Sequence, residues 1–151
     1  MRRPALLLLV LAAAGCGSTT SAPAIALLTD VQPKAGSVVF EFQSAPREVR
    51  ARYRPPSQIA ESGSGAPVRL LGRAVLVVTF TPAATARIDG EQVVPTYTGP
   101  KRLRAEGSGP VLEVVKVGDF EAQLDWAIGL EQRTAYRVER DGSRVTITFG
   151  P

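Results

Sequence analysis

Histidine is absent from the 151-residue sequence, and cysteine, methionine and tryptophan each occur once. Without histidine the chain has no Ser-His-Asp or Cys-His arrangement for nucleophilic catalysis, and it lacks the usual general base near neutral pH. A single cysteine excludes an internal disulfide, and the lack of histidine beside it excludes the common zinc sites. We therefore expect a fold held by burial alone, with no catalytic residue, no metal and no cofactor.

Long apolar runs are also missing. The longest, residues 5–14, is about half of the roughly 20 residues that a bilayer-spanning helix needs. It follows two arginines and leads through small residues into Cys16. A basic start, a short apolar run and small residues before a cysteine are typical of the bacterial lipobox. We predict cleavage before Cys16 and attachment of diglyceride and palmitate at that residue.

The lipobox has one departure, because Ala13 stands where leucine is usual. The alternative is an ordinary signal peptide with Cys16 as a spare thiol, but exported domains seldom keep an unpaired cysteine without a use for it. The predicted location is the cell envelope, on the outer face of the cytoplasmic membrane. The predicted organisation is a signal peptide at residues 1–15, a lipidated cysteine and flexible tether at 16–24, and one folded domain at 25–151.

Charge of either sign is nearly balanced once the export signal is removed. The whole sequence carries +4, and loss of Arg2 and Arg3 leaves 16 basic and 14 acidic side chains, a formal charge of +2. A charge this small gives no long-range attraction to nucleic acid. Little nucleic acid is present outside the cytoplasm, so we expect no nucleic-acid partner.

Turn-forming residues interrupt the rest of the chain at short intervals, with 12 prolines and 14 glycines. Between them, alternation of apolar and polar residues predicts about nine strands and no amphipathic helix. The strands are expected at residues 25–29, 37–43, 47–54, 68–71, 74–81, 111–117, 121–128, 135–140 and 143–149. Tight turns are expected at Gly118-Asp119 and Asp141-Gly142, and a long irregular excursion at residues 85–110. An all-β antiparallel sandwich or barrel follows.

Two of these strands have unusual faces. Residues 75–78 are apolar on both sides, which predicts a central strand that is covered on each face. In the strand at 47–54, Arg50, Arg52 and Arg54 share one face at a spacing of roughly 6.6 Å. Such a stripe favours binding of phosphate or carboxylate groups. It also fits a charged edge strand that prevents aggregation.

Trp126 and a group of carboxylates are the other candidate site residues. Alternation places Trp126 beside Leu124 and Ile128, which favours the core; stacking on a sugar ring is the alternative. Four acidic residues also cluster in the sequence, namely Glu113, Asp119, Glu121 and Asp125. Two carboxylates about 5 to 9.5 Å apart would suffice for a glycoside hydrolase. A solvated strand face explains these residues more simply.

Short motifs follow one another in a fixed order along the chain beyond the tether. They are Val-Val-Phe-Glu-Phe at 38–42, Arg-Ala-Arg-Tyr at 50–53, Gly-Ser-Gly-Ala-Pro-Val at 63–68, Gly-Arg-Ala-Val-Leu at 72–76, Gly-Asp-Phe-Glu at 118–121, Trp-Ala-Ile-Gly-Leu at 126–130 and Tyr-Arg-Val at 136–138. This ordered set resembles the AMIN-like domain of actinobacterial lipoproteins. The resemblance implies a β-sandwich. By analogy with AMIN domains on cell-wall amidases, it also implies attachment to peptidoglycan or envelope machinery.

Two positions depart from that family pattern. Gly36-Ser37 stands where the family enters its first main strand with Asp-Arg, and Thr148 stands where its last strand closes on an aspartate. If those polar residues pair or meet a ligand in relatives, this protein lacks that feature.

Three hypotheses for function follow. The leading one is a non-enzymatic, membrane-anchored lipoprotein whose β-sandwich binds peptidoglycan or another anionic wall polymer. The second is an envelope assembly factor without a ligand of its own, in which residues 85–110 recognise an envelope protein. The third is a wall hydrolase that uses two of the carboxylates.

Overall fold

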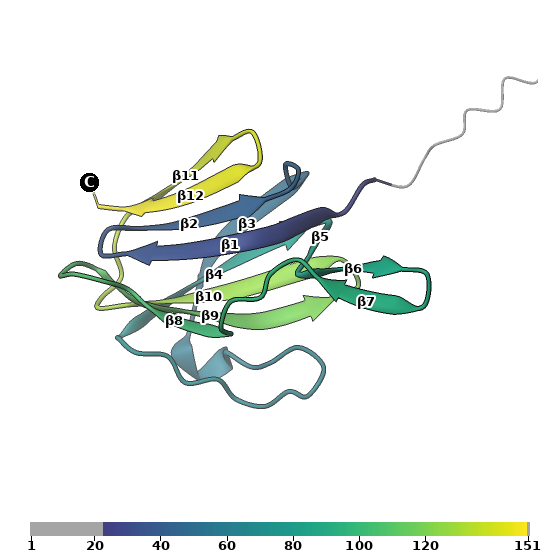
Figure 1. Ribbon diagram of the computed structural model, residues 1–151. Coiled ribbons are helices and arrows are strands. Elements are labelled where there is room, and N and C mark those ends of the chain that lie inside the picture. The colour runs from purple at the N-terminus through teal and green to yellow at the C-terminus, as the bar shows by residue number, and fades with distance from the viewer. Residues whose placement is uncertain (1–22, 151) are drawn as a thin grey trace, which may run out of the picture.

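The computed structural model describes residues 23–150, and it contains two five-stranded sheets packed face to face (Figure 1). Sheet 1 has the order β11 (Tyr136–Asp141), β12 (Arg144–Phe149), β2 (Ser37–Phe42), β1 (Ala26–Lys34) and β5 (Ala83–Ala84). Sheet 2 has the order β3 (Glu48–Arg54), β4 (Ala74–Thr81), β10 (Gln123–Leu130), β9 (Val111–Phe120) and β8 (Arg102–Arg104). Among the described strand pairs only β1 and β5 run parallel, and one isolated parallel bridge joins Lys34 to Glu106. The predicted antiparallel β-sandwich is confirmed.

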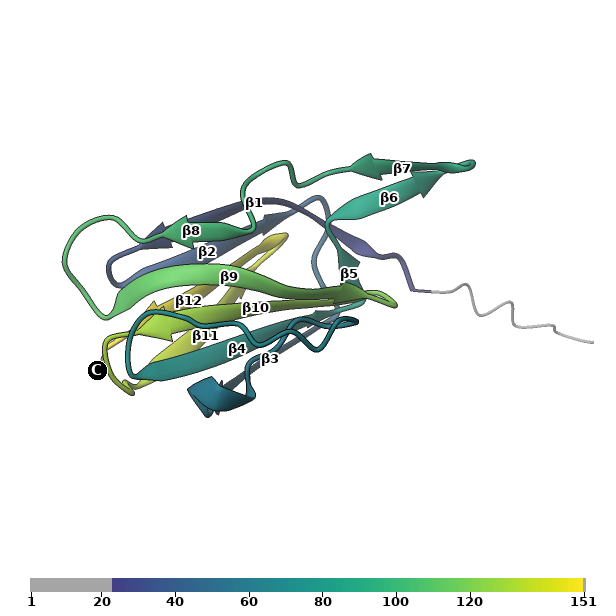
Figure 2. The ribbon, with the colours of Figure 1, turned by 90° about the horizontal axis from the view of Figure 1, so that it is seen from below.

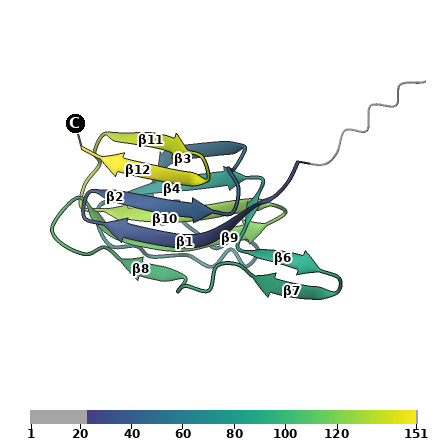
Figure 3. The same ribbon diagram turned by 45° about the horizontal axis from the view of Figure 1, so that its top comes forward.

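A separate hairpin of β6 (Ala86–Asp89) and β7 (Gln92–Pro95) projects from one end of the sandwich (Figure 2). Figure 3 looks onto sheet 1 and shows the hairpin leaving the molecule at the end where the described chain begins. One short 3-10 helix, η1 (Pro56–Gln58), follows β3. No helix within residues 23–150 is long and apolar enough to cross a membrane. The predicted signal peptide and Cys16 lie outside the described residues.

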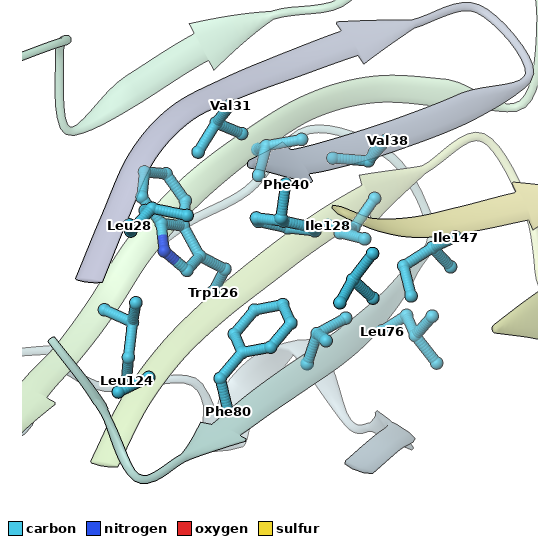
Figure 4. Packing of buried hydrophobic residues seen from close by; sticks show 14 of the residues in the cluster. Leu28, Val31, Val38, Phe40, Leu76, Phe80, Leu124, Trp126, Ile128 and Ile147 are labelled. Atoms are coloured by element: carbon cyan, nitrogen blue, oxygen red, sulfur yellow. The ribbon is translucent and has the colours of Figure 1, made fainter. Parts of the chain in front are cut away.

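The core lies between the sheets because each strand presents alternate apolar residues to the other sheet (Figure 4). Phe40 of β2 packs against Phe80 of β4, with ring centroids 4.9 Å apart, and against the edge of Trp126, with centroids 6.0 Å apart. Trp126 is fully buried, and Tyr97 meets its ring at 90°. The core prediction for Trp126 is confirmed. The alternative of a sugar-stacking residue is wrong, since no part of its ring reaches the surface.

The outer face of sheet 2 is apolar as well, and residues 55–73 lie across it as a covering segment. Within this segment Ile59, Val68 and Leu70 pack onto the sheet. They cover a second buried cluster that is built from Val75, Val115, Val117 and Ala127. The prediction that residues 75–78 are covered on both faces is therefore confirmed.

Residues 68–71 do not form the strand that their alternation predicts. Val68 and Leu70 alternate because they face the sheet while their neighbours face water, so a covering loop reproduces the pattern of a half-buried strand. Its backbone is fixed elsewhere: the Val68 amide donates to the Ile59 carbonyl within the segment, at 2.9 Å.

Glu113 on β9 fastens the covering segment to sheet 2. Its side chain is 1% exposed, and Oε1 accepts hydrogen bonds from the Leu71 amide at 2.7 Å and from the Arg102 guanidinium at 2.6 Å. Arg102 also donates to the Arg69 carbonyl at 3.0 Å. The carboxylate thus joins three separate parts of the chain: β9, β8 and the covering segment.

Both predicted turns are displaced in the structure. β9 continues through Gly118-Asp119 to Phe120, and the turn falls on Glu121 and Ala122, whose φ angles are 50° and 58°. The last hairpin pairs Asp141 with Arg144, so its two-residue loop is Gly142-Ser143, one residue later than predicted. Gly142 has a φ of 56°, which suits the first loop position of a type II′ turn.

The predicted irregular excursion at residues 85–110 contains three strands, β6, β7 and β8. Each has only three or four residues. Segments this short show too few alternations for a periodic pattern to be recognised.

Replacing Gly72 with alanine should destabilise the protein strongly. Gly72 has a φ of 95°, and a Cβ there would lie 1.9 Å from the Leu130 carbonyl oxygen. We expect a loss of more than about 3 kcal/mol in urea unfolding. Gly90→Ala is the matched control: its φ is 62° but nothing lies within 4 Å, so we expect a loss of about 1 kcal/mol. Equal losses for the two variants would contradict the close approach.

Replacing Glu113 with alanine should loosen the covering segment and lower stability by about 2 to 4 kcal/mol, because the Leu71 amide and Arg102 lose their acceptor. Hydrogen exchange of residues 55–73 should accelerate more than that of β2. Glu91→Ala removes an equivalent charge from an exposed loop and should change neither measurement. Unchanged exchange in the covering segment of Glu113→Ala would show that the contact does not hold it.

Candidate functional site

The predicted arginine stripe lies on β3, an edge strand that pairs only with β4 in sheet 2. Arg50, Arg52 and Arg54 are exposed, whereas the residues between them pack against the core. The alternation predicted for this strand is confirmed. The stripe is therefore both a charged sheet edge and, as the cavities beside it show, one wall of a depression.

Two adjoining cavities of about 180 and 170 Å³ lie between β3 and the covering segment. They share Arg54, Val77, Thr79 and Gln123, so they form one continuous depression, which we call the arginine groove. Its remaining lining residues are Arg50, Arg52, Gln58, Ile59, Ala60, Ser62, Val117 and Asp125. At this size the groove accommodates one polar group of a larger molecule rather than a whole drug-sized ligand.

Asp125 of β10 forms the acidic floor of the groove and is 9% exposed. The Thr79 hydroxyl donates to Oδ1 at 2.5 Å, and the Gln123 amide donates to Oδ2 at 2.8 Å. Gly118 lies beside it on β9, where a Cβ would come within 2.9 Å of Oδ2. The neighbouring strands thus fix the carboxylate in place and leave room for it only because residue 118 is glycine.

The three arginines that line the groove differ in whether they form ion pairs. Arg50 pairs with Glu48 at 2.7 Å, but both side chains are at least half exposed, so the pair contributes little. Within residues 23–150 neither Arg52 nor Arg54 forms an ion pair. These two groups are free to bind carboxylate or phosphate oxygens, and Asp125, which lines the same cavity as Arg54, can accept a hydrogen bond from a hydroxyl or amide.

The other predicted carboxylates are not part of the groove. Asp119 accepts hydrogen bonds from the Thr85 amide and hydroxyl and lies 3.7 Å from the Lys116 ammonium. Glu113 is buried beneath the covering segment. The prediction of a solvated acidic face is therefore wrong for Glu113 and Asp125, which are buried. Asp119 and Glu121 are exposed, as that prediction requires.

Glu113 and Asp125 are too far apart to act as the two carboxylates of a glycoside hydrolase. Asp125 is opposite Gly118 in the β9–β10 register, five residues beyond Glu113. At about 3.3 Å per residue, roughly 16 Å separate the two positions along the strands, beyond the range for two cooperating carboxylates.

The surroundings of two side chains outside the groove shift their pKa values. The Lys101 ammonium pairs with Glu61 of the covering segment and lowers the pKa of that carboxyl. Burial raises the pKa of Tyr97, whose hydroxyl donates to the Pro100 carbonyl at 2.8 Å. Neither group lines the groove. Within residues 23–150 no cluster of three acidic, histidine or cysteine side chains is placed to hold a metal ion.

Sequence reasoning missed the floor and the far wall of the groove. Thr79 and Gln123 carry no motif, and the covering segment was expected to be a loop followed by a strand. Asp125 did carry a signal. It was one of the four clustered carboxylates singled out in the sequence, although its burial and its place in the groove follow only from the pairing of β10 with β4 and β9.

Known proteins give two kinds of match. The chain is similar to the probable ribonuclease FAU-1 of Pyrobaculum calidifontis, at 33% identity over 94 residues, which is 61% of this chain and 21% of that protein. It is also similar to the probable ribonuclease FAU-1 of Pyrobaculum arsenaticum, at 33% identity over 129 residues, which is 76% of this chain and 29% of that protein. The chain therefore spans less than a third of the length of these relatives.

No solved structure matches the chain significantly. A family model does: the model of the AMIN-like domain matches residues 31–149, which include all of the strands of both sheets except the start of β1. The matched region contains the whole arginine groove. The chain therefore belongs to the AMIN-like domain family.

Proposed function

We propose that this protein is a cell-envelope lipoprotein, anchored through Cys16 to the outer face of the cytoplasmic membrane, whose domain binds an anionic wall polymer such as peptidoglycan. The lipobox at the start of the sequence supports the anchor. Membership of the AMIN-like family supports a binding role related to the cell wall.

The arginine groove is the observation that carries the proposed binding role. Arg52 and Arg54 offer guanidinium donors without competing ion pairs in the described part of the chain, and Asp125 offers a fixed acceptor in the same groove. Wall polymers combine carboxylate or phosphate groups with hydroxyl and amide groups. A donor row next to a single acceptor suits that combination, since the anion meets the arginines and a neighbouring hydroxyl or amide meets Asp125.

We propose further that the domain has no catalytic activity. Asp125 is already engaged by Thr79 and Gln123, and no second carboxylate lines the groove among the described residues. Hydrolysis of a glycosidic bond by acid and base needs two such groups. This arrangement supports binding of the polymer without cleavage.

The probable ribonucleases among the relatives raise RNA as a competing ligand, because guanidinium groups also pair with its phosphates. The chain covers only a minor part of those proteins. The formal charge of +2 expected for the mature chain and the proposed location outside the cytoplasm both favour the wall polymer. RNA is therefore a control in the binding experiment below.

Cys16→Ser should abolish lipidation and leave the protein in its precursor form. Cells grown with a palmitate analogue should label the wild-type protein and not the variant, because the thiol is the acceptor for the diglyceride. Fractionation should place the labelled protein with the membrane. An unlabelled wild-type protein in the cytosol would contradict the proposed anchor.

The double variant Arg52→Ala/Arg54→Ala should bind purified wall sacculi roughly tenfold more weakly than the wild type at low salt, because two charge-assisted contacts are lost. Co-sedimentation measures the binding. Arg137→Ala/Arg144→Ala is the matched control: it removes the same charge from two exposed arginines of sheet 1, which pair with Glu139 and with the partly buried Glu41. Equal loss in the two double variants would indicate binding by net charge alone. Preferential binding of an RNA oligonucleotide by the groove would contradict the proposed ligand.

A further inference from the structure

Four of the five large apolar side chains that remain exposed within residues 23–150 belong to one end of the sandwich. Ile88 and Val93 are 79% and 69% exposed and are partners across the β6–β7 hairpin, so they form one apolar surface. Phe120 is 67% exposed at the end of β9, and Ile25 is 48% exposed immediately before β1. We call these four residues the apolar end.

The elements that carry the apolar end are tied to one another. Ala83 of β5 pairs with Ala26 at the start of β1 and donates to the Ala122 carbonyl in the β9–β10 turn, at 2.8 Å. Thr85, at the base of the hairpin, donates hydrogen bonds from its amide and its hydroxyl to the carboxylate of Asp119, the residue before Phe120. All three ribbon views place the hairpin, the β9–β10 turn and the start of β1 at the same end (Figures 1, 2 and 3).

We propose that the apolar end is a membrane-contact surface that rests on the outer leaflet to which Cys16 is anchored. This inference rests on the anchor in the proposed function. Nine residues lead from Cys16 to Ile25, so the anchor lies at most about 30 Å from the apolar end even if that stretch is fully extended. The tether therefore joins the domain at the end that carries the exposed isoleucine, valine and phenylalanine side chains.

The contact sets the orientation of the domain. An acylated cysteine already retains the protein at the membrane, but an anchor at one point does not fix which face of the domain meets the bilayer. Insertion of the four side chains at the boundary between headgroups and acyl chains removes apolar surface from water and holds the strands away from the bilayer. The arginine groove, on the outer face of sheet 2, then opens sideways along the membrane surface.

The charged residues near the apolar end do not attract the membrane surface, so the proposed contact depends on burial of the apolar side chains. The charged residues that flank the four side chains in the sequence are two ion pairs and two single carboxylates, namely Arg87–Asp89 at 2.9 Å, Lys116–Asp119 at 3.7 Å, Glu91 and Glu121. The excess of acidic groups is repelled by anionic lipid. We therefore expect contact with uncharged headgroups that does not strengthen when anionic lipid is added.

Tryptophan probes on tethered protein test this surface. The chain from Cys16 onward is coupled through its only thiol to a maleimide-bearing phospholipid in phosphatidylcholine vesicles whose acyl chains are brominated. Ile88→Trp and Phe120→Trp place probes on two different elements of the apolar end. Ser108→Trp is the control, in the exposed loop at the opposite end beside the β1–β2 turn. Trp126 is fully buried and supplies a constant background that also reports folding.

Bromine should quench the emission of both apolar-end probes by about half and leave the Ser108→Trp emission unchanged, because only residues that reach the acyl boundary meet the quencher. Ile88→Asp/Val93→Asp should relieve the quenching of the Phe120→Trp probe. Equal emission from the three probes in folded protein would overturn the membrane contact and assign the patch to a protein partner. Stronger quenching on addition of phosphatidylglycerol would also overturn it. Chemical coupling makes these results independent of lipidation in cells, which palmitate labelling decides separately.

Discussion

The apolar outer face of sheet 2 must be shielded from water, and this requirement shapes the side of the molecule that carries the groove. Val75, Val115 and Ala127 would be exposed if residues 55–73 did not lie across them. The cover extends over β9, β10 and β4 and stops short of β3. The arginine groove lies at the boundary between the covered and uncovered parts of the sheet. The covering segment therefore both completes the fold and forms one wall of the candidate site.

Edge protection and ligand binding were alternative interpretations of the arginine stripe, and the geometry combines them. β3 needs charge on its outer face because it has no partner on one side. The same charges line a depression only because Asp125 and the covering segment lie beside them. The charges that protect the sheet edge therefore include two guanidinium groups, without ion pairs in residues 23–150, that a ligand can reach.

The sequence predicted the regular parts of the fold well and the irregular parts poorly. The alternation in residues 37–43 and 74–81 is strong because each strand is long and faces a core, and both strands lie where expected. The failures have physical causes. Loop residues 68–71 imitate a strand by covering a sheet, and the strands within residues 85–110 are too short to show a period. The arginines of the site were visible in the sequence, but Thr79, Gln123 and the far wall depend on contacts between distant segments.

The antiparallel pairing of β1 with β2 also determines how the domain responds to force. The described chain enters at the start of β1, and the hydrogen bonds to β2 run nearly perpendicular to the strand. A pull applied along β1 from its start would load this row of hydrogen bonds in shear and share the load among them. Strands loaded in this way resist extension far better than strands that are peeled apart one bond at a time. The topology thus suits a domain that bears mechanical tension between a membrane and a wall.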